Sequence, residues 1–286
     1  MASSQVPRDP VHKLEYMAHK TIRFTKMEGL GNDYIYIDIS RFPVDNPSEL
    51  SIKLSDRHYG IGADGIILIG PSDNADFSMR IFNADGSEGL MCGNGARCVG
   101  KYLYDKHLAD KTTLTLETLS GVRTLNLNIK DNVVESVTVD MGMYLLTDAP
   151  SAIVSAGRTF KGTGISVGNP HYVIFTDDAE VLDLSAYGPE IENNPVFPDR
   201  TNVEFAIVTA PDTIRMRVWE RGSGITKACG TGACATAAAA VEAGIVNECC
   251  SIVMDGGSLF VHCNKKSGRI SMRGPAVTIF EGEIEI

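Results

Sequence analysis

The sequence predicts an α+β protein made of two homologous halves related by a pseudo-twofold axis, each a mostly antiparallel sheet wrapped around a central helix. Three observations lead to this fold class. The chain has 286 residues, the length of about two average domains. Two stretches, "MCGNGARC" and "ACGTGAC", share one cysteine and glycine pattern, and their cysteines, Cys92 and Cys229, lie 137 positions apart (229 − 92). Each stretch introduces a helical pattern that strand patterns follow.

The repeat extends beyond the cysteine stretches. When the chain is shifted along itself by the same 137 residues, the Gly-Asn pair at 31–32 falls on the pair at 168–169, and each pair precedes an apolar, strand-like run. Residues 80–83 fall on 217–220, two strand-like runs that end in a polar residue shortly before the cysteine stretch. The shared order of turns, strands and helix indicates that the halves are homologous.

One long helix is predicted in each half, in "ARCVGKYLYDKHL" and in "ACATAAAAVEAGI". Alanine favours helix, and small apolar residues at positions i, i+3 and i+4 form a face that packs against a flat surface. Strand patterns then resume in "TTLTLETLSGVRTLNLNI" and in "CCSIVMDGGSLFVHCN". Each helix is therefore expected to pack on a sheet of its own half.

The halves are expected to divide near residues 141–157, with Cys92 in the first and Cys229 in the second. Ligand sites favour clefts between domains, so both cysteine stretches are expected to meet in such a cleft. The predicted parts are an N-terminal extension at 1–20, an N-terminal half at 21–142 that is completed by a C-terminal strand at 276–286, and a C-terminal half at 143–275.

Charge and composition exclude several classes of partner. The net charge is −10, the isoelectric point is near 5.1, and no cluster of Lys and Arg is present, which argues against nucleic acid. No apolar run approaches the roughly 20 residues needed to cross a bilayer, and residues 1–20 lack the apolar core of a secretory signal. The seven cysteines are therefore expected to be reduced thiols in the cytoplasm. Four of them are expected in the core as inert thiols: Cys98, Cys249, Cys250 and Cys263.

The sequence gives no support for a nucleotide, a metal or another cofactor. "GIGADG", residues 60–65, matches the G-x-G-x-x-G pattern of dinucleotide loops, but the strand-like run "IILIG" follows it where such a loop would open a helix. We expect a turn there. Histidines at a spacing that would complete a zinc site with the cysteine pairs are absent from the sequence.

A cysteine at a helix start has a specific chemical meaning. A helix N-terminus presents unpaired backbone N–H groups and about half a positive charge, so a thiolate there is expected to be stabilised and its pKa lowered. The glycines of "CGNG" and "CGTG" let the backbone approach a ligand closely. Two such thiols facing each other across a cleft can remove a proton from one face of a carbon and return one to the other face.

Six motifs, in this order, give the chain a strong resemblance to the diaminopimelate epimerase family: "MEGLGNDYI", "RIFNADGSE", "MCGNGARC", "GNPHYV", "ERGSG" and "ACGTGA". The resemblance runs from residue 22 to residue 286. It implies a cofactor-independent isomerase that interconverts LL-2,6-diaminopimelate and meso-2,6-diaminopimelate in lysine and peptidoglycan precursor synthesis. It also implies a two-half fold around a cleft, a cytoplasmic location and a homodimer.

The resemblance further implies roles for single residues. Cys92 and Cys229 would be the two proton-transfer residues, and His171 and Glu220 would tune the pKa values of these thiols. The residues implied to hold the substrate are Asn32, Asn83, Gly93, Asn94, Asn169, Asn202, Glu220, Arg221, Gly230 and Thr231. An Arg suits a carboxylate because its fork binds in a bidentate way, and each Asn amide can both donate and accept.

Two positions depart from the family pattern. Several members carry Gln where this chain has Gly65, which implies that one substrate contact is missing or made by backbone. The family's Tyr at the dimer contact corresponds to Phe280, which lacks the hydroxyl.

Two alternatives remain at this point. A proline or hydroxyproline racemase shares the fold and the cysteine pair, although that family typically has "MCGHG" where this chain has Asn94. A thiol redox module would instead use Cys92 and Cys229 as a switchable disulfide.

Overall fold

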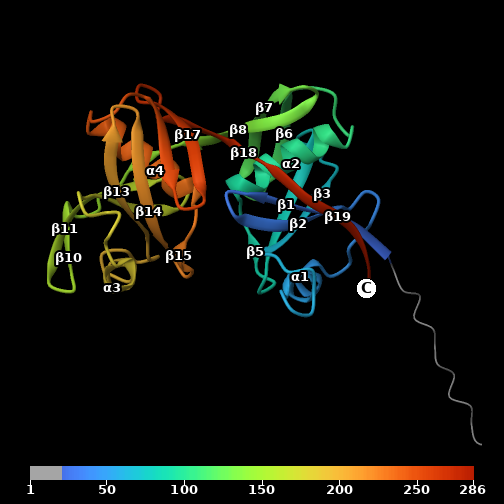
Figure 1. The fold of residues 1–286 in the computed structure, drawn as a ribbon, viewed down its shortest axis with the longest axis horizontal. Helices are drawn as coiled ribbons and strands as arrows, with labels where there is room; N and C mark the ends of the chain where they lie inside the picture. Colours follow the sequence, from blue (N-terminus) through green and yellow to red (C-terminus); the bar gives the residue numbers. More distant parts are fainter. Residues whose placement is uncertain (1–20) are drawn as a thin grey trace, which may run out of the picture.

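The computed structural model describes residues 21–286, and the predicted extension at 1–20 lies outside the described residues. Within that part of the chain, 19 strands and four helices form two lobes (Figure 1). The elements up to residue 143 are β1 (Thr21–Gly29), β2 (Asn32–Asp38), α1 (Pro47–Ser55), β3 (Gly65–Gly70), β4 (Phe77–Asn83), β5 (Glu88–Gly89), α2 (Gly93–Asp105), β6 (Thr113–Thr118), β7 (Gly121–Lys130) and β8 (Val133–Met143). The elements that follow are β9 (Leu145–Leu146), β10 (Ala152–Ser155), β11 (Arg158–Ser166), β12 (Pro170–Phe175), α3 (Leu184–Glu192), β13 (Asn202–Ala210), β14 (Thr213–Glu220), β15 (Gly224–Thr226), α4 (Gly230–Glu242), β16 (Cys249–Met254), β17 (Gly257–Asn264), β18 (Arg269–Pro275) and β19 (Val277–Glu285).

The predicted repeat is present in the structure. Helices α1 and α3, helices α2 and α4, and strands β1 and β11 each begin and end 137 residues apart, the interval between Cys92 and Cys229. Most strand pairs are antiparallel, and the four parallel pairs also match between halves: β2–β3 with β12–β13, and β4–β6 with β14–β16. The predicted fold class is therefore confirmed.

The sheet of the first half has a hydrophobic core on each of its two faces. In β3, which is buried along its whole length, Ile67 and Ile69 face the core that contains α2, while Ile66 and Leu68 face a smaller core that contains α1. Successive side chains of a strand point to opposite faces, so one apolar run serves both cores. The strand follows residues 60–64, as expected for "GIGADG" as a turn, and Gly62 has a φ of +80°.

The two lobes are joined by strands that pass from one to the other. β8 and β18 pair antiparallel, and Val137 pairs with Gly274, the residue one repeat interval further along the chain. The pseudo-twofold axis therefore passes through this pair. β19 then leaves β18 and lies along β1 in the other lobe, from Thr21 opposite Glu285 to Glu28 opposite Val277 (Figure 1).

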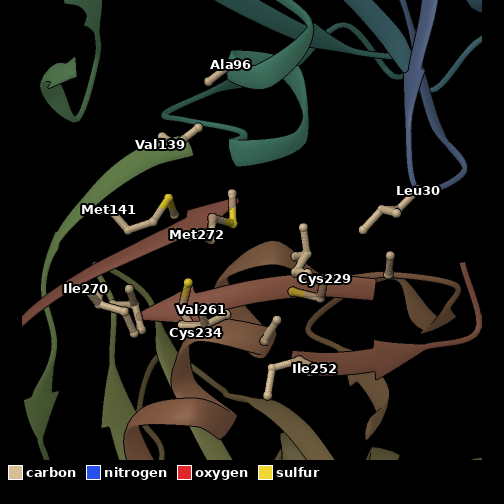
Figure 2. Close-up of a cluster of buried hydrophobic side chains, with 14 of the residues drawn as sticks. Leu30, Ala96, Val139, Met141, Cys229, Cys234, Ile252, Val261, Ile270 and Met272 are labelled. Atoms are coloured by element: carbon tan, nitrogen blue, oxygen red, sulfur yellow. The ribbon is translucent and has the colours of Figure 1, made fainter. Parts of the chain in front are cut away.

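The main core is continuous between the halves and contains both long helices. In α4, alanines allow close packing, and 10 of its residues are buried. Met272 of β18 and Met141 of β8 lie side by side between the two halves (Figure 2). A Cβ at Gly93 would overlap the Met272 side chain, and one at Gly230 would lie 3.2 Å from it. Glycine at both helix starts thus makes room for the linking strand.

One core prediction is wrong. Cys249 is exposed, whereas Cys98, Cys250 and Cys263 are buried as expected. Cys249 and Cys250 are neighbours in β16, and adjacent residues of a strand face opposite sides of the sheet. None of the helices formed by residues 21–286 is both long enough and apolar enough to cross a membrane.

Candidate active site

Cys92 and Cys229 occupy the same structural position in the two halves. Each is the N-cap of a long helix, with φ and ψ of −131° and 114° for Cys92 and of −125° and 112° for Cys229. In each helix the sulfur accepts a hydrogen bond from the backbone N–H three residues on, Gly95 or Gly232, at 3.3 Å. Because helical hydrogen bonding leaves the first N–H groups without acceptors, the two preceding amides of each helix can bind an anion.

The two thiols line one cleft between the halves. The cleft has a volume of about 490 Å³ and is also lined by Tyr34, Arg123 and Met141. All ten of the implied substrate-holding residues line it: Asn32, Asn83, Gly93, Asn94, Asn169, Asn202, Glu220, Arg221, Gly230 and Thr231. His171 does not line the cleft. A second cavity adjoins it and shares Asn32, Asn83 and Glu220.

Asn32 lies beside the thiol of Cys92. The sulfur donates a hydrogen bond to Asn32 Oδ1 at 3.4 Å. Asn32 Nδ2 in turn donates to Asp64 Oδ2 at 2.8 Å, and Asp64 is held by Arg57 through an ion pair at 3.1 Å. The carboxylate of Asp64 therefore fixes the orientation of the Asn32 amide, so that its oxygen faces Cys92.

A second chain of contacts ends at Cys229. His171 is 2% exposed. Its ring Nδ1 lies 2.7 Å from Glu204 Oε1, and its Nε2 lies 3.0 Å from Asn169 Oδ1. Asn169 Nδ2 donates to the Thr231 hydroxyl at 3.3 Å, and that hydroxyl lies 3.5 Å from Cys229 Sγ. His171 is thus linked to the sulfur by hydrogen bonds through Asn169 and Thr231, and on its other side it contacts Glu204.

The remaining polar residues of the cleft are also held in place. Asn202 donates to the carbonyl of Pro170 at 2.8 Å and accepts from the Arg221 backbone N–H at 3.0 Å. The Arg221 guanidinium donates to the Asp199 carbonyl at 2.8 Å. Asn83 donates to the Ser87 hydroxyl at 3.0 Å. The Glu220 carboxylate accepts from the Thr226 hydroxyl.

The expectation of lowered thiol pKa values is wrong for this structure. Burial raises the pKa of Cys92, although the Gly95 N–H and the Arg97 charge act in the opposite direction. Burial raises the pKa of Cys229 well above its usual range, and the carboxylates of Glu220 and Glu204 add to that shift. Desolvation of a charged sulfur outweighs the favourable helix amides. Burial also raises the pKa of Glu220.

Residues 24–146 and 163–279 match the sequence profile of a family described as "Diaminopimelate epimerase". The chain belongs to the diaminopimelate epimerase family. A relative of that name from Parabacteroides distasonis is 55% identical over 267 residues, which cover 93% of this chain and 99% of the relative. Another, from Methanococcus maripaludis, is 46% identical over 277 residues, covering 93% of this chain and 100% of the relative. The chain is therefore an isomerase, and the resemblance seen in its motifs is confirmed.

Solved structures show the same fold at much lower identity. A phenazine biosynthesis protein of the PhzF family from Bacillus anthracis superposes with a TM-score of 0.71 at 18% identity, covering 93% of this chain and all of that one. A hydroxyproline epimerase from Agrobacterium vitis gives a TM-score of 0.67 at 15% identity, covering 93% and 91%. The epimerase fold is thus shared by proteins with different names, and the family assignment rests on the closer relatives.

Two buried charged residues near the thiols were not singled out from the sequence. Glu204 is fully buried in β13, in contact with His171, and Arg97 is fully buried in α2. A glutamate in the middle of the apolar run "NVEFAI" is the signal for the first. An arginine in the first turns of a helix is common on protein surfaces, so the sequence carries no comparable signal for the second.

The two departures from the family pattern have structural counterparts. Gly65 begins β3, and a Cβ there would overlap the carbonyl oxygen of Phe82 and lie 2.8 Å from the Tyr34 ring. This position does not line the cleft, so it offers no side-chain contact to a substrate. Phe280 lies on β19, is 46% exposed and packs edge-to-face on Phe24 at 5.9 Å between ring centroids.

Proposed function

We propose that this chain interconverts LL- and meso-2,6-diaminopimelate with Cys92 and Cys229 as its two proton-transfer residues. One observation carries the proposal: two equivalent helix N-cap thiols line a single cleft together with all ten implied substrate-holding residues. The curated relatives named diaminopimelate epimerase support the choice of substrate.

The reaction needs one thiolate and one thiol. The thiolate takes the α-hydrogen of the bound substrate as a proton, and the electron pair of the C–H bond stays on the α-carbon. The opposite thiol then donates its proton to the other face of that carbon, which inverts the configuration. At the end the first sulfur is a thiol and the second a thiolate, so the reverse reaction uses the same two groups with exchanged roles.

The helix starts supply the stabilisation that this carbanion requires. We propose that the backbone amides of Gly93, Asn94, Gly230 and Thr231 bind the carboxylate next to the reacting carbon. Developing negative charge then faces two helix N-termini in the cleft between the halves. The asparagines and Arg221 would hold the amino and carboxylate groups at the other end of the substrate.

Further proposals concern the whole molecule. We propose that residues 21–142 with 276–286, and residues 143–275, act as two halves that close on the substrate. We also propose a cytoplasmic homodimer. β19 supports a dimer, because it pairs only with β1 among the described strands and exposes about half of Ile279 and Phe280. Phe280→Glu should convert the dimer to a monomer in light scattering, and a wild type that is already monomeric would contradict this.

The proposed roles are tested by Cys92→Ser and Cys229→Ser, with Cys249→Ser as the control because Cys249 is exposed and outside the cleft. Under reductant, both cleft variants should lose LL-to-meso conversion by at least about 100-fold, the range of one general acid or base. The control should keep the wild-type rate. Wild-type conversion in either cleft variant would overturn the role of that thiol.

The two alternative activities predict different results. A racemase would turn over L-proline, and a redox module would lose its function in reductant. The proposal requires no turnover of L-proline and full activity in reductant, since both cysteines act as free thiols.

A further inference from the structure

Arg97 is a buried cation without a carboxylate partner among residues 21–286. It is fully buried in α2, and its Nε donates to the carbonyl of Pro275 at 3.0 Å. Neither Nη1 nor Nη2 has a hydrogen-bond partner within the described chain, and no ion pair to Arg97 is formed there. A guanidinium stays protonated at neutral pH, so its charge remains in the protein interior. Such a charge is costly unless nearby groups compensate it.

The guanidinium is placed by two glycines at the junction of the halves. A Cβ at Gly29 of β1 would lie 3.0 Å from Arg97 Nη2, and a Cβ at Gly274 of β18 would lie 3.1 Å from Arg97 Nε. That Cβ position on Gly29 also lies 3.3 Å from the Cβ of Asn94, in the first turn of α2. The charge therefore lies against the helix turn that Cys92 caps.

The groups that act on the two thiols differ in charge. Around Cys92 they are Arg97 of α2, Glu220 of β14, and the neutral hydroxyl or thiol groups of Tyr34, Tyr36 and Cys98. The nearby charge of Arg97 favours the Cys92 thiolate, whereas that of Glu220 opposes it.

Around Cys229 the charged groups are two carboxylates, Glu220 and Glu204, and both oppose its ionisation. His171 lies on the far side of Glu204 and Asn169 from the sulfur.

The repeat makes this difference explicit. One interval of 137 residues from Arg97 lies Cys234, which is neutral, so the C-terminal half has no cation at that place. One interval before Glu204 lies Ile67, so the N-terminal half has no carboxylate there. The two equivalent helix starts thus differ in one charged neighbour each: Cys92 has the cation Arg97 near it, and Cys229 has the carboxylate of Glu204.

We propose that Arg97 is a positioning residue that places the thiolate of the resting pair on Cys92 and leaves the proton on Cys229. The inference rests on the proposed function, in which the pair carries one proton. It follows that the resting enzyme is ready for the isomer whose α-hydrogen faces Cys92. After that turnover the proton is on Cys92, and it must return to Cys229 through solvent or through the reverse reaction.

The test follows the ionisation of each thiol without substrate. The rate of alkylation by iodoacetamide is measured from pH 6 to 11 at Cys92 and Cys229 separately, by mass spectrometry of peptides. The variants are Arg97→Met, which removes the charge, and Arg97→Lys, which keeps it. Lys101→Met is the matched control, because Lys101 is a buried cation one turn further along α2 that already pairs with Asp105 at 2.6 Å.

In the wild type, the midpoint of the pH profile at Cys92 should lie below that at Cys229. In Arg97→Met it should rise by about one pH unit or more at Cys92, the size of a nearby opposite charge, and by less than half as much at Cys229. Arg97→Lys should restore most of the shift, and Lys101→Met should leave the Cys92 midpoint unchanged.

Equal midpoints in the wild type, or a lower midpoint at Cys229, would overturn the inference even if Arg97→Met fails to fold. An equal shift in Lys101→Met would assign the effect to loosened packing and would also overturn it. Because alkylation needs no diaminopimelate, a failure here is distinct from a failure of the proposed epimerisation, which the conversion assay detects.

Discussion

The N-cap position of the two cysteines predicts that chemistry and stability can be separated by single substitutions. Serine is among the best N-cap residues, and its hydroxyl can accept the bond from Gly95 or Gly232 that the sulfur now accepts at 3.3 Å. Sulfur is a weak acceptor. Cys92→Ser and Cys229→Ser should therefore fold at least as well as the wild type while losing activity.

The expected magnitude follows from the loss of a cap. Replacing a good N-cap by Ala costs about 1 kcal/mol, so Cys92→Ala should be less stable than Cys92→Ser by about that amount. For a chain of this length, 1 kcal/mol corresponds to a shift of roughly 2–4 °C in Tm. The same difference is expected between Cys229→Ala and Cys229→Ser.

Urea denaturation at pH 7 measures the free energy of unfolding of the Ala and Ser variants at Cys92 and at Cys229. Cys249→Ala and Cys249→Ser are the control. Cys249 is exposed in a strand and caps no helix, so its two variants should agree within about 0.5 kcal/mol. If Cys92→Ser and Cys92→Ala have the same free energy of unfolding, an acceptor side chain at this N-cap contributes no stability. The predicted difference would then be wrong.

Three further predictions concern packing and ionisation. Gly65→Ala places a Cβ on the Phe82 carbonyl oxygen and should destabilise the fold by about 1–3 kcal/mol in urea; an unchanged midpoint would contradict the packing. Burial raises the pKa of Cys98 to about 11, so the fold favours its neutral thiol: the stabilisation is complete below the unfolded pKa of about 8.5 and is lost as pH rises towards 11. Between pH 8.5 and 11, the free energy of unfolding should therefore fall by on the order of 2 kcal/mol less in Cys98→Ala than in the wild type. An equal fall in the two proteins would refute this. Glu204→Gln removes a carboxylate that opposes ionisation of Cys229, so alkylation of Cys229 should shift to lower pH while Cys92 does not shift; a fixed Cys229 profile would count against that role.

The repeat could be predicted from sequence because it is a local pattern copied once. A single shift of 137 residues, without gaps, aligned both Gly-Asn turns and both cysteine helices, and the structure places them in equivalent positions. The helix N-termini could also be predicted, since the glycines after Cys92 and Cys229 indicate a backbone that a ligand can approach closely.

The sequence predicted that a C-terminal strand at 276–286 would complete the N-terminal half, but the pairing of β8 with β18 and of β19 with β1 depends on contacts between distant segments. Their detailed registers, such as that of Val137 with Gly274, are set by how the two halves face each other. No hydrophobic pattern within one strand specifies its partner in the other half.

The pKa shifts of the two thiols could be predicted from the sequence only in part. The helix amides predict lowered thiol pKa values, but the depth at which Cys92 and Cys229 are buried reverses the direction. Burial depends on how the two halves pack around the cleft, which the local sequence does not specify. Arg97 is a similar case, because its position between Gly29 and Gly274 joins residues from opposite ends of the chain.

Two thiols on opposite faces of one carbon should exchange its proton with solvent. The most direct measurement is the conversion of LL-diaminopimelate in D₂O under reductant, stopped before one turnover per active site, with the product analysed for deuterium and configuration. Transfer by two thiols predicts one deuterium at the inverted α-carbon of each meso product and none in unreacted LL substrate. Inversion that retains the original hydrogen at that carbon would contradict transfer between two separate thiols.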